Sequence, residues 1–216
     1  MAISRKPKNG TNPVAPDNLL DASGAKLQSA KEKRQALTRE KFIQSGHDLL
    51  REVGREKLSL REVARRSDYS PAAIYEYFGS KQDLIDEIAN RILEQFAGVL
   101  NDARAQSGAE CDPLTSLAMA YVAFAKDHHH DFLLVFGEQR SLQQSGSKVY
   151  QVFVNALAFQ SAKRNLDPSL CGQQAYRLWT ALHGLAMLQI THFGSVGEAT
   201  SIQAMGGFVE GLGVRL

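Results

Sequence analysis

The run SLREVARRSDYSPAAIYEYFGSKQDLI, residues 59–85, decides the fold prediction. Its spacing of apolar and capping residues predicts two short helices joined by a tight turn, over residues 59–66 and 70–77. Helices of about eight residues are marginally stable alone. Both must therefore pack on a neighbouring helix, which makes this segment a helix-turn-helix with a supporting first helix.

Capping residues mark the start of each short helix. Ser59 and Glu62 have the spacing of a capping box, and Ser70 followed by Pro71 is an N-cap residue before a proline at the first helical position. On the inner side of these helices we expect the apolar residues Leu60, Val63, Ala64, Ile74 and Phe78.

The supporting helix is predicted upstream, from Ser29 to Gly54. A capping box opens it at Ser29, and Gly54 suits its C-terminal end. Apolar residues recur along it at helical spacing, namely Phe42, Ile43, Leu49, Leu50 and Val53.

Small and hydroxyl-bearing residues on the second short helix fit contacts with DNA. Ala72 and Ala73 allow close approach to base edges, and Tyr75 and Tyr77 offer hydroxyls to phosphates. Lys81 begins the next helix, where an anion is favoured. The candidate DNA-binding residues are Arg39, Ser59, Arg61, Tyr69, Ser70, Ala72, Ala73, Tyr75, Tyr77 and Lys81. The alternative is a compact three-helix bundle with a solvated basic face.

The run 59–85 resembles the DNA-binding region of the TetR (tetracycline-repressor-like) family, most specifically in Ile-Tyr-x-Tyr-Phe-x-x-Lys, residues 74–81. The resemblance implies a dimeric, ligand-responsive transcription regulator, usually a repressor, with a variable helical C-terminal domain. Two residues depart from the family pattern: Asp68 stands where the family often has glycine, and Tyr69 where it often has valine. Aspartate tolerates the left-handed conformation better than most residues, so the turn is expected to form.

Charge divides the chain into two parts. The net charge of the 216 residues is +2, but residues 1–81 carry +6 and residues 82–216 carry −4. We therefore expect a disordered basic arm over 1–28, a helix-turn-helix DNA-binding domain over 29–81 and a ligand-binding and dimerisation domain over 82–216. Whether Arg5, Lys6 and Lys8 of the arm touch DNA or form a terminus without a role stays open.

The remaining sequence predicts an all-α protein of about nine helices, because strand signals are nearly absent. Beyond the helix-turn-helix, helices are expected over about 80–106, from Asp112-Pro113, over 129–137 and 144–164, from Asp167-Pro168 to 192, and over 197–213. The chain has neither an apolar stretch of transmembrane length nor a signal-peptide pattern, and its two cysteines are far apart. These features predict a cytoplasmic protein.

The C-terminal part contains the sequence Trp179-x-x-x-His183-Gly184, which resembles a C-terminal domain type of TetR-like regulators named for a Trp-His-Gly signature. The candidate ligand-binding residues are Trp179 and His183, followed by Tyr121, Phe132, Phe136 and Met187. Such a pocket suits an apolar or aromatic small molecule. A core histidine bonded to a backbone carbonyl is the alternative for His183.

The helix predicted from Asp167-Pro168 to 192 is apolar on more than one side, which indicates burial on more than one side, and the helix predicted over 197–213 follows it. We expect them to form a homodimer interface, while the alternative is that both faces are monomer core.

Enzyme motifs are missing from the sequence, which contains no GxSxG, HExxH, P-loop or dinucleotide fingerprint. The three adjacent histidines, residues 128–130, invite a metal hypothesis, but consecutive helical residues point in different directions. We therefore predict a DNA-binding regulator with no catalytic residues, cofactor or metal. The competing hypotheses are a small helical enzyme or ligand carrier, and a protein–protein adaptor.

Overall fold

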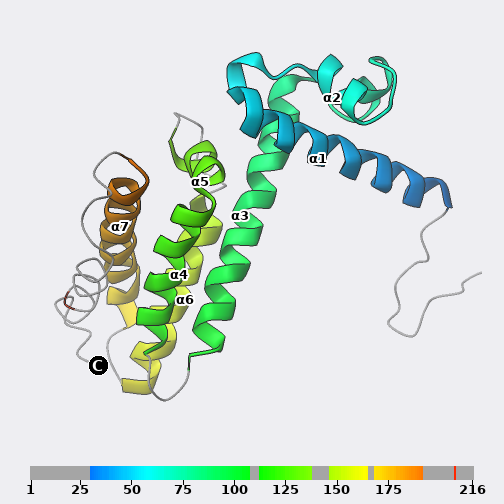
Figure 1. Cartoon of the computed structure of the whole chain (residues 1–216). Coiled ribbons are helices and arrows are strands. Elements are labelled where there is room, and N and C mark those ends of the chain that lie inside the picture. Colours follow the sequence, from blue (N-terminus) through cyan, green and yellow to red (C-terminus); the bar gives the residue numbers. More distant parts are fainter. Residues whose placement is uncertain (1–29, 108–111, 138–145, 165–167, 192–206, 208–216) are drawn as a thin grey trace, which may run out of the picture. The chain divides into compact units, whose positions relative to one another are not determined.

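The computed structural model describes residues 30–107, 112–137, 146–164, 168–191 and 207, and in these residues it contains helices and no strand (Figure 1). The helices are α1 (Ala30–Lys57), α2 (Leu60–Arg66), η1 (Ala73–Glu76), α3 (Lys81–Ala105), α4 (Pro113–Asp127), α5 (His129–Phe136), α6 (Gly146–Arg164), η2 (Pro168–Leu170) and α7 (Cys171–Ile190).

The all-α prediction is confirmed, but the predicted count of about nine helices is corrected to seven α-helices in the described residues. Two short elements, η1 and η2, are 3-10 helices. The helix predicted over 197–213 lies outside the described residues apart from Gly207, and the arm predicted over 1–28 lies entirely outside them.

The chain forms two compact units, residues 1–41 and 42–216. In the first unit the structure describes the opening turns of α1, residues 30–41, where most side chains are exposed and Thr38 and Arg39 are half-buried. All elements from Phe42 onward belong to the second unit. The boundary predicted between residues 81 and 82 falls at the start of α3 and stays a prediction.

The helix-turn-helix has its own apolar centre within the second unit. Phe42, Val63 and Ile74 are fully buried, and they come from α1, α2 and η1. All five residues predicted to face inward on the two short elements are buried, namely Leu60, Val63, Ala64, Ile74 and Phe78. Gly46 allows α1 to approach α3 closely, because a Cβ atom there would lie 3.0 Å from Leu84 Cδ2.

Two positions with positive φ shape the ends of the first helices. Gly54 has φ 75° and interrupts α1, in agreement with its predicted place at a helix end. Asp68 has φ 62°, and the backbone N–H groups of Asp68 and Tyr69 donate to the carbonyls of Arg65 (3.2 Å) and Ala64 (2.9 Å). This is a Schellman motif with Asp68 in the left-handed position that glycine usually occupies. The turn predicted at Asp68 is confirmed.

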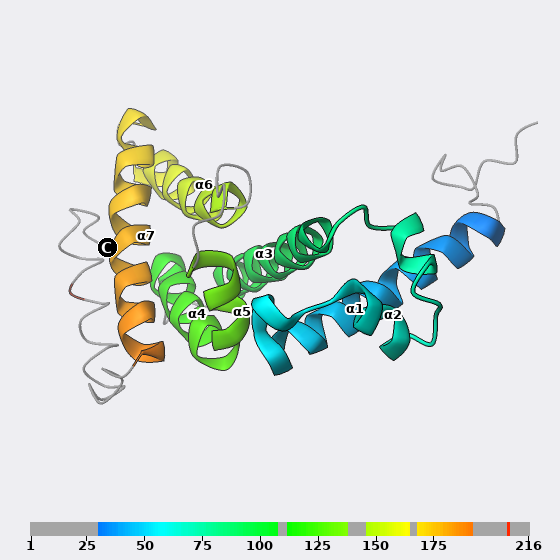
Figure 2. The same cartoon turned by 90° about the horizontal axis from the view of Figure 1, so that it is seen from above.

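The C-terminal helices form a bundle in which α4 and α6 lie between α3 and α7 (Figures 1 and 2). Asp112 caps α4 by accepting hydrogen bonds from the backbone N–H groups of Leu114 (2.9 Å) and Thr115 (3.2 Å). The inward face of α7 is Ala175, Leu178, Leu182 and Ala186, which are all buried. In the described parts of the chain, no helix combines the length and apolar character needed to cross a membrane.

Candidate functional site

The recognition segment, residues 70–77, differs from the predicted α-helix. Only Ala73–Glu76 is regular, and it is a 3-10 helix. Its backbone bonds join residues three apart, from Tyr75 to Ala72 (3.2 Å) and from Tyr77 to Ile74 (3.0 Å). The segment is short and is fixed at both ends, by Ser70, which accepts hydrogen bonds from the Ala73 N–H, and by buried Phe78. Short pieces of this kind commonly adopt the tighter helix.

The exposed side of this segment is defined by the 3-10 geometry, in which residues three apart lie one above the other. Ala72 and Tyr75 have this spacing, both are exposed, and 53% of Tyr75 is accessible. Ser70 is also exposed, whereas Ala73 packs partly against the core. Glu76, next to Tyr75, is also exposed. It was not among the predicted DNA-binding residues.

Tyr69 and Tyr77 are half-buried, and both pack against the ring of Phe42. Their ring centroids lie 5.1 and 5.4 Å from that of Phe42, in edge-to-face geometry. Aromatic contacts of this kind contribute stability beyond the buried area. The two tyrosines therefore hold the recognition segment against α1, a packing role that the sequence analysis did not predict for them.

The remaining candidate DNA-binding residues are Ser59, Lys81, Arg61 and Arg39. Ser59 has the extended backbone of an N-cap, but its side chain makes no cap hydrogen bond, which departs from the predicted capping box. Lys81 Nζ donates to the backbone oxygen of Glu56 (3.1 Å), so it ties the end of α1 to the start of α3. Arg61 is exposed on α2, and Arg39 is half-buried in the first unit.

Two arginines of α2 form ion pairs with acidic residues. Arg66 makes a two-pronged ion pair with Glu52 (2.8 and 2.6 Å), and Arg65 makes one with Glu62 (2.8 and 2.6 Å). The hydrogen bonds from Arg65 and Arg66 outweigh burial and lower the pKa of Glu62 to about 2. Glu62 is therefore an arginine partner here, and the positive charge of Arg65 and Arg66 is partly balanced.

Aromatic side chains converge on Tyr121 in the C-terminal bundle. Tyr121 is fully buried on α4, and its hydroxyl accepts a hydrogen bond from Trp179 Nε1 (3.1 Å). The same hydroxyl lies 3.0 Å from Nδ1 of His183. The His183 ring stacks on Phe132 (5.4 Å, 27°) and meets the edge of Phe136 (5.1 Å, 70°). Tertiary packing thus brings five of the six candidate ligand-binding residues into one cluster.

Burial sets the protonation of this cluster. It lowers the pKa of His183, which favours the neutral ring, and it raises the pKa of Tyr121 more than the hydrogen bond from Trp179 lowers it. When neutral His183 carries its proton on Nε2, its Nδ1 accepts a hydrogen bond from the Tyr121 hydroxyl, and the hydrogen bonds then run from Trp179 through Tyr121 to His183. Met187, the sixth candidate, is half-buried one turn further along α7 and packs against the core.

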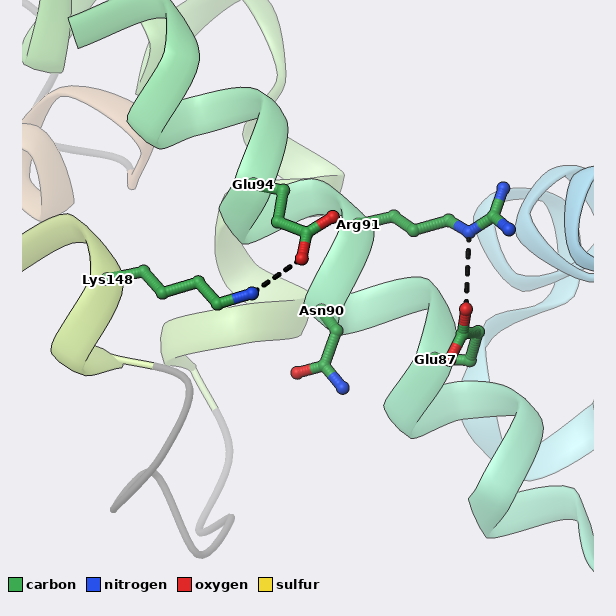
Figure 3. Close-up of a pocket in the computed structure, with 5 residues that line it drawn as sticks. All are labelled: Glu87, Asn90, Arg91, Glu94 and Lys148. Atoms are coloured by element: carbon green, nitrogen blue, oxygen red, sulfur yellow. Dashed lines mark hydrogen bonds and ion pairs between the residues drawn. The ribbon is translucent and has the colours of Figure 1, made fainter. Parts of the chain in front are cut away.

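Polar pockets line the outer surface of the bundle. One, of about 520 Å³, is open to solvent and lies between α3 and α6, lined by Glu87, Asn90, Arg91, Glu94 and Lys148 (Figure 3). Glu94 of α3 pairs across it with Lys148 of α6 (2.5 Å), and Glu87 pairs with Arg91 one turn along α3 (3.5 Å). Its charged residues are satisfied by one another, and none of the predicted ligand-binding residues lines it.

The three adjacent histidines have separate surroundings. His128 packs on Phe124 (4.6 Å), while His129 and His130 are exposed and face each other at 4.0 Å. Within the described ranges, no group of three or more histidine, cysteine, aspartate or glutamate side chains is arranged to hold a metal ion.

Two family models match the sequence. The model described as bacterial regulatory proteins, tetR family, matches residues 42–88, and the model described as the tetracyclin repressor-like C-terminal domain matches residues 114–205. Together the two segments cover more than half of the chain. No curated protein matches the sequence.

Solved structures share the fold at low sequence identity. A protein of unknown function from Rhodococcus sp. RHA1 has 22% identity and a TM-score of 0.71, covering 81% of this chain and 94% of its own. A TetR-family transcriptional regulator from Streptomyces coelicolor has 21% identity and a TM-score of 0.58, covering 82% and 98%. The multidrug binding protein EbrR, complexed with imidazole, has 19% identity and a TM-score of 0.60, covering 79% and 93%. At these identities the likeness concerns the fold.

Proposed function

The chain belongs to the TetR family of bacterial regulatory proteins, and we propose that it is a repressor released from a palindromic operator when a small apolar or aromatic molecule binds its C-terminal domain. Membership of the family makes it a ligand-responsive, DNA-binding transcriptional regulator and not an enzyme. The observation that carries the operator proposal is the recognition segment, which presents Ala72 and Tyr75 to solvent on one face.

Base reading is proposed for the small residues Ala72 and Ala73, since an alanine methyl contacts the thymine methyl in the major groove. Phosphate contacts are proposed for the hydroxyls of Ser59, Ser70, Tyr69, Tyr75 and Tyr77 and for the cations Arg39, Arg61 and Lys81. Tyr75 is the strongest candidate, because its ring is half exposed while those of Tyr69 and Tyr77 pack on Phe42.

Ligand binding is proposed at the cluster around Tyr121. Aromatic and apolar surface with a few polar groups is the usual composition of a small-molecule site. Phe132, Phe136, Trp179 and Met187 supply the apolar surface, and His183 supplies a polar group beside it. The juxtaposition of Trp179 and His183 on Tyr121 supports the proposal that this is a C-terminal domain of the Trp-His-Gly type.

A homodimer through α7 and the following segment is proposed as the DNA-binding form. Four residues spaced one turn apart on α7 are exposed, namely Tyr176, Thr180, Gly184 and Leu188, and over half of Tyr176 and of Leu188 is accessible. Such a stripe suits a partner helix, with Gly184 permitting close approach. The final helix predicted for this interface lies outside the described residues. We propose the cytoplasm as the compartment, where the operator DNA is found.

Selection of bound duplexes from genomic fragments and from a random pool tests the proposed function. We expect a near-palindromic site with half-sites about one helical turn apart or a small multiple of it. Affinity is expected to fall steeply between about 50 and 200 mM salt, because lysine and arginine contacts release counterions. Absence of any selected sequence in the ligand-free protein would refute the operator proposal. Release of the selected duplex by a screened small molecule, together with a change in the emission of the single tryptophan, Trp179, would identify the ligand.

A further inference from the structure

A single buried acid joins α5 to the helix that supports the recognition segment. Asp131 on α5 is 6% exposed, and its Oδ1 lies 2.7 Å from Nε2 of His47 on α1. The two residues are 84 positions apart in the sequence. This is a polar contact between the helix-turn-helix and the C-terminal bundle.

The charges around this pair favour an ionised acid. Burial raises the pKa of Asp131, but the hydrogen bond to His47 and the positive charges of His47, Arg51 and His128 outweigh it and hold the pKa below its ordinary value. On α3, which also packs against α5, Glu87 and Arg91 pair with each other. Loss of one partner from a pair with a buried member is costly, because the remaining charge is left desolvated.

Residues next to Asp131 on α5 belong to the proposed ligand site. Phe132 stacks on His183, and one turn later Phe136 contacts both His183 (5.1 Å) and Trp179 (6.4 Å). A short helix of eight residues thus carries the wall of the aromatic cluster on one side and the bond to His47 on another. Because all three residues lie on one short helix, any shift of α5 would move Asp131 together with Phe132 and Phe136.

The helix α1, which carries His47, also contacts the recognition segment. Phe42 lies five residues before His47 on the same helix, and its ring holds Tyr69 and Tyr77. Gly46, next to His47, packs α1 against Leu84 and Ile88 of α3 through apolar contacts. Apolar packing of this kind is non-directional, whereas a hydrogen bond fixes an angle and a distance.

We propose that the His47–Asp131 pair is a latch through which α5 transmits the state of the aromatic cluster to the DNA-binding helices. The proposal rests on the proposed function, since it concerns the regulation of the same two sites. Any such coupling is reciprocal, so DNA binding at the recognition segment must in turn alter the surroundings of the cluster. Trp179, the single tryptophan, is placed to report this change because it contacts Phe136 of α5.

The experiment uses the full chain and the duplex that it selects from a random pool. We expect the emission of Trp179 to change when wild-type protein binds this duplex. In H47Q and in D131N the change should be mostly lost, and affinity for the duplex should fall by about fivefold, at the lower end of typical coupling between sites. The double variant should be no worse than the more impaired single variant, because both substitutions break the same contact.

Two matched controls separate the latch from a general effect of charge. D48N removes an exposed acid beside His47 that accepts a hydrogen bond from Gln44 (3.1 Å). E94Q breaks an exposed ion pair between α3 and α6. Both should retain the wild-type emission change and affinity. H47Q keeps the test valid if D131N fails to fold, since His47 is only half-buried.

Three results would overturn the latch. One is wild-type affinity and emission change in H47Q. Another is the absence of any emission change when the wild-type protein binds its duplex. The third is an unchanged rate of hydrogen exchange over residues 129–136 in H47Q, a measurement that needs no DNA and in which we expect faster exchange. If no duplex is selected at all, the proposed function fails first, and that result is distinct from these three.

Discussion

The hydroxyl of Tyr121 lies 3.0 Å from His183 Nδ1 and 3.1 Å from Trp179 Nε1, so one fully buried oxygen serves two side chains of α7. Tyr121 is on α4, and 58 and 62 residues separate it from its two partners. This relationship fixes how α7 sits on α4 at the level of the aromatic cluster. It also makes the cluster sensitive to small changes, because each of these polar groups depends on the same atom.

Removal of the Tyr121 hydroxyl should destabilise the protein while leaving the ring in place. In Y121F, Trp179 Nε1 and His183 Nδ1 lose a common partner, and we expect a loss of about 1–3 kcal/mol in the free energy of unfolding. Urea denaturation followed by circular dichroism measures this loss. Y75F, which alters an exposed tyrosine of the recognition segment, should leave stability unchanged. Equal stability of Y121F and wild type would show that the oxygen is not needed.

Truncation of Tyr75 should weaken operator binding without affecting the fold. We expect Y75A to lose about tenfold in affinity for the selected duplex, which corresponds to roughly one hydrogen bond of ~1.4 kcal/mol. Its melting temperature should stay at the wild-type value, because the side chain is half exposed. Fluorescence anisotropy with labelled duplex measures the affinity, and unchanged affinity would remove Tyr75 from the DNA contacts.

Tyr77 should contribute to stability through its ring and to operator binding through its hydroxyl. Its ring packs on Phe42, so Y77A should lose about 2 kcal/mol of stability, whereas Y77F should keep the wild-type melting temperature. If the hydroxyl contacts phosphate, Y77F should bind the duplex several-fold more weakly. A Y77A protein as stable as wild type would contradict the packing role assigned to this ring.

The left-handed turn at Asp68 should prefer glycine to alanine. At φ 62° an alanine Cβ crowds the backbone, so D68A should be less stable than D68G by about 1 kcal/mol. Asp102 is an exposed residue within α3 and gives the matched control, where the order should reverse and D102G should be the less stable by about 1 kcal/mol. Denaturant midpoints of the four variants decide the matter, and the same order at both positions would be inconsistent with a special turn.

Acid should destabilise the protein through His183. Burial lowers the folded-state pKa of His183 below its ordinary value near 6.5, so between the two values the unfolded chain binds the proton more readily than the folded one. This contribution to stability is complete above pH 6.5 and is lost as the pH falls through the folded-state pKa. Melting temperatures measured between pH 5 and 7.5 should fall with acid more steeply in wild type than in H183Q. Parallel curves would mean that His183 does not contribute.

Local sequence determined where the two short elements of the helix-turn-helix lie and which residues start the helices α3 and α4. Ser80 and Asp112 accept hydrogen bonds from the first turns of α3 and α4, as their positions predict. Asp68 adopts the left-handed conformation expected of the turn, and Ile74 and Phe78 are buried. These features follow from bonds within a few residues and from apolar spacing, which a sequence records directly.

Tertiary structure alone decided which residues far apart in the chain share a partner. The recognition segment is a 3-10 helix followed by Phe78, which is buried in the core of the helix-turn-helix, a tertiary contact that helix propensity does not contain. Tyr69 and Tyr77 turned toward Phe42 because the core offered an aromatic surface. The pairing of His47 with Asp131, across 84 residues, depends on how α5 packs on α1. Such contacts arise from the packing of whole helices, and no spacing within either segment predicts them.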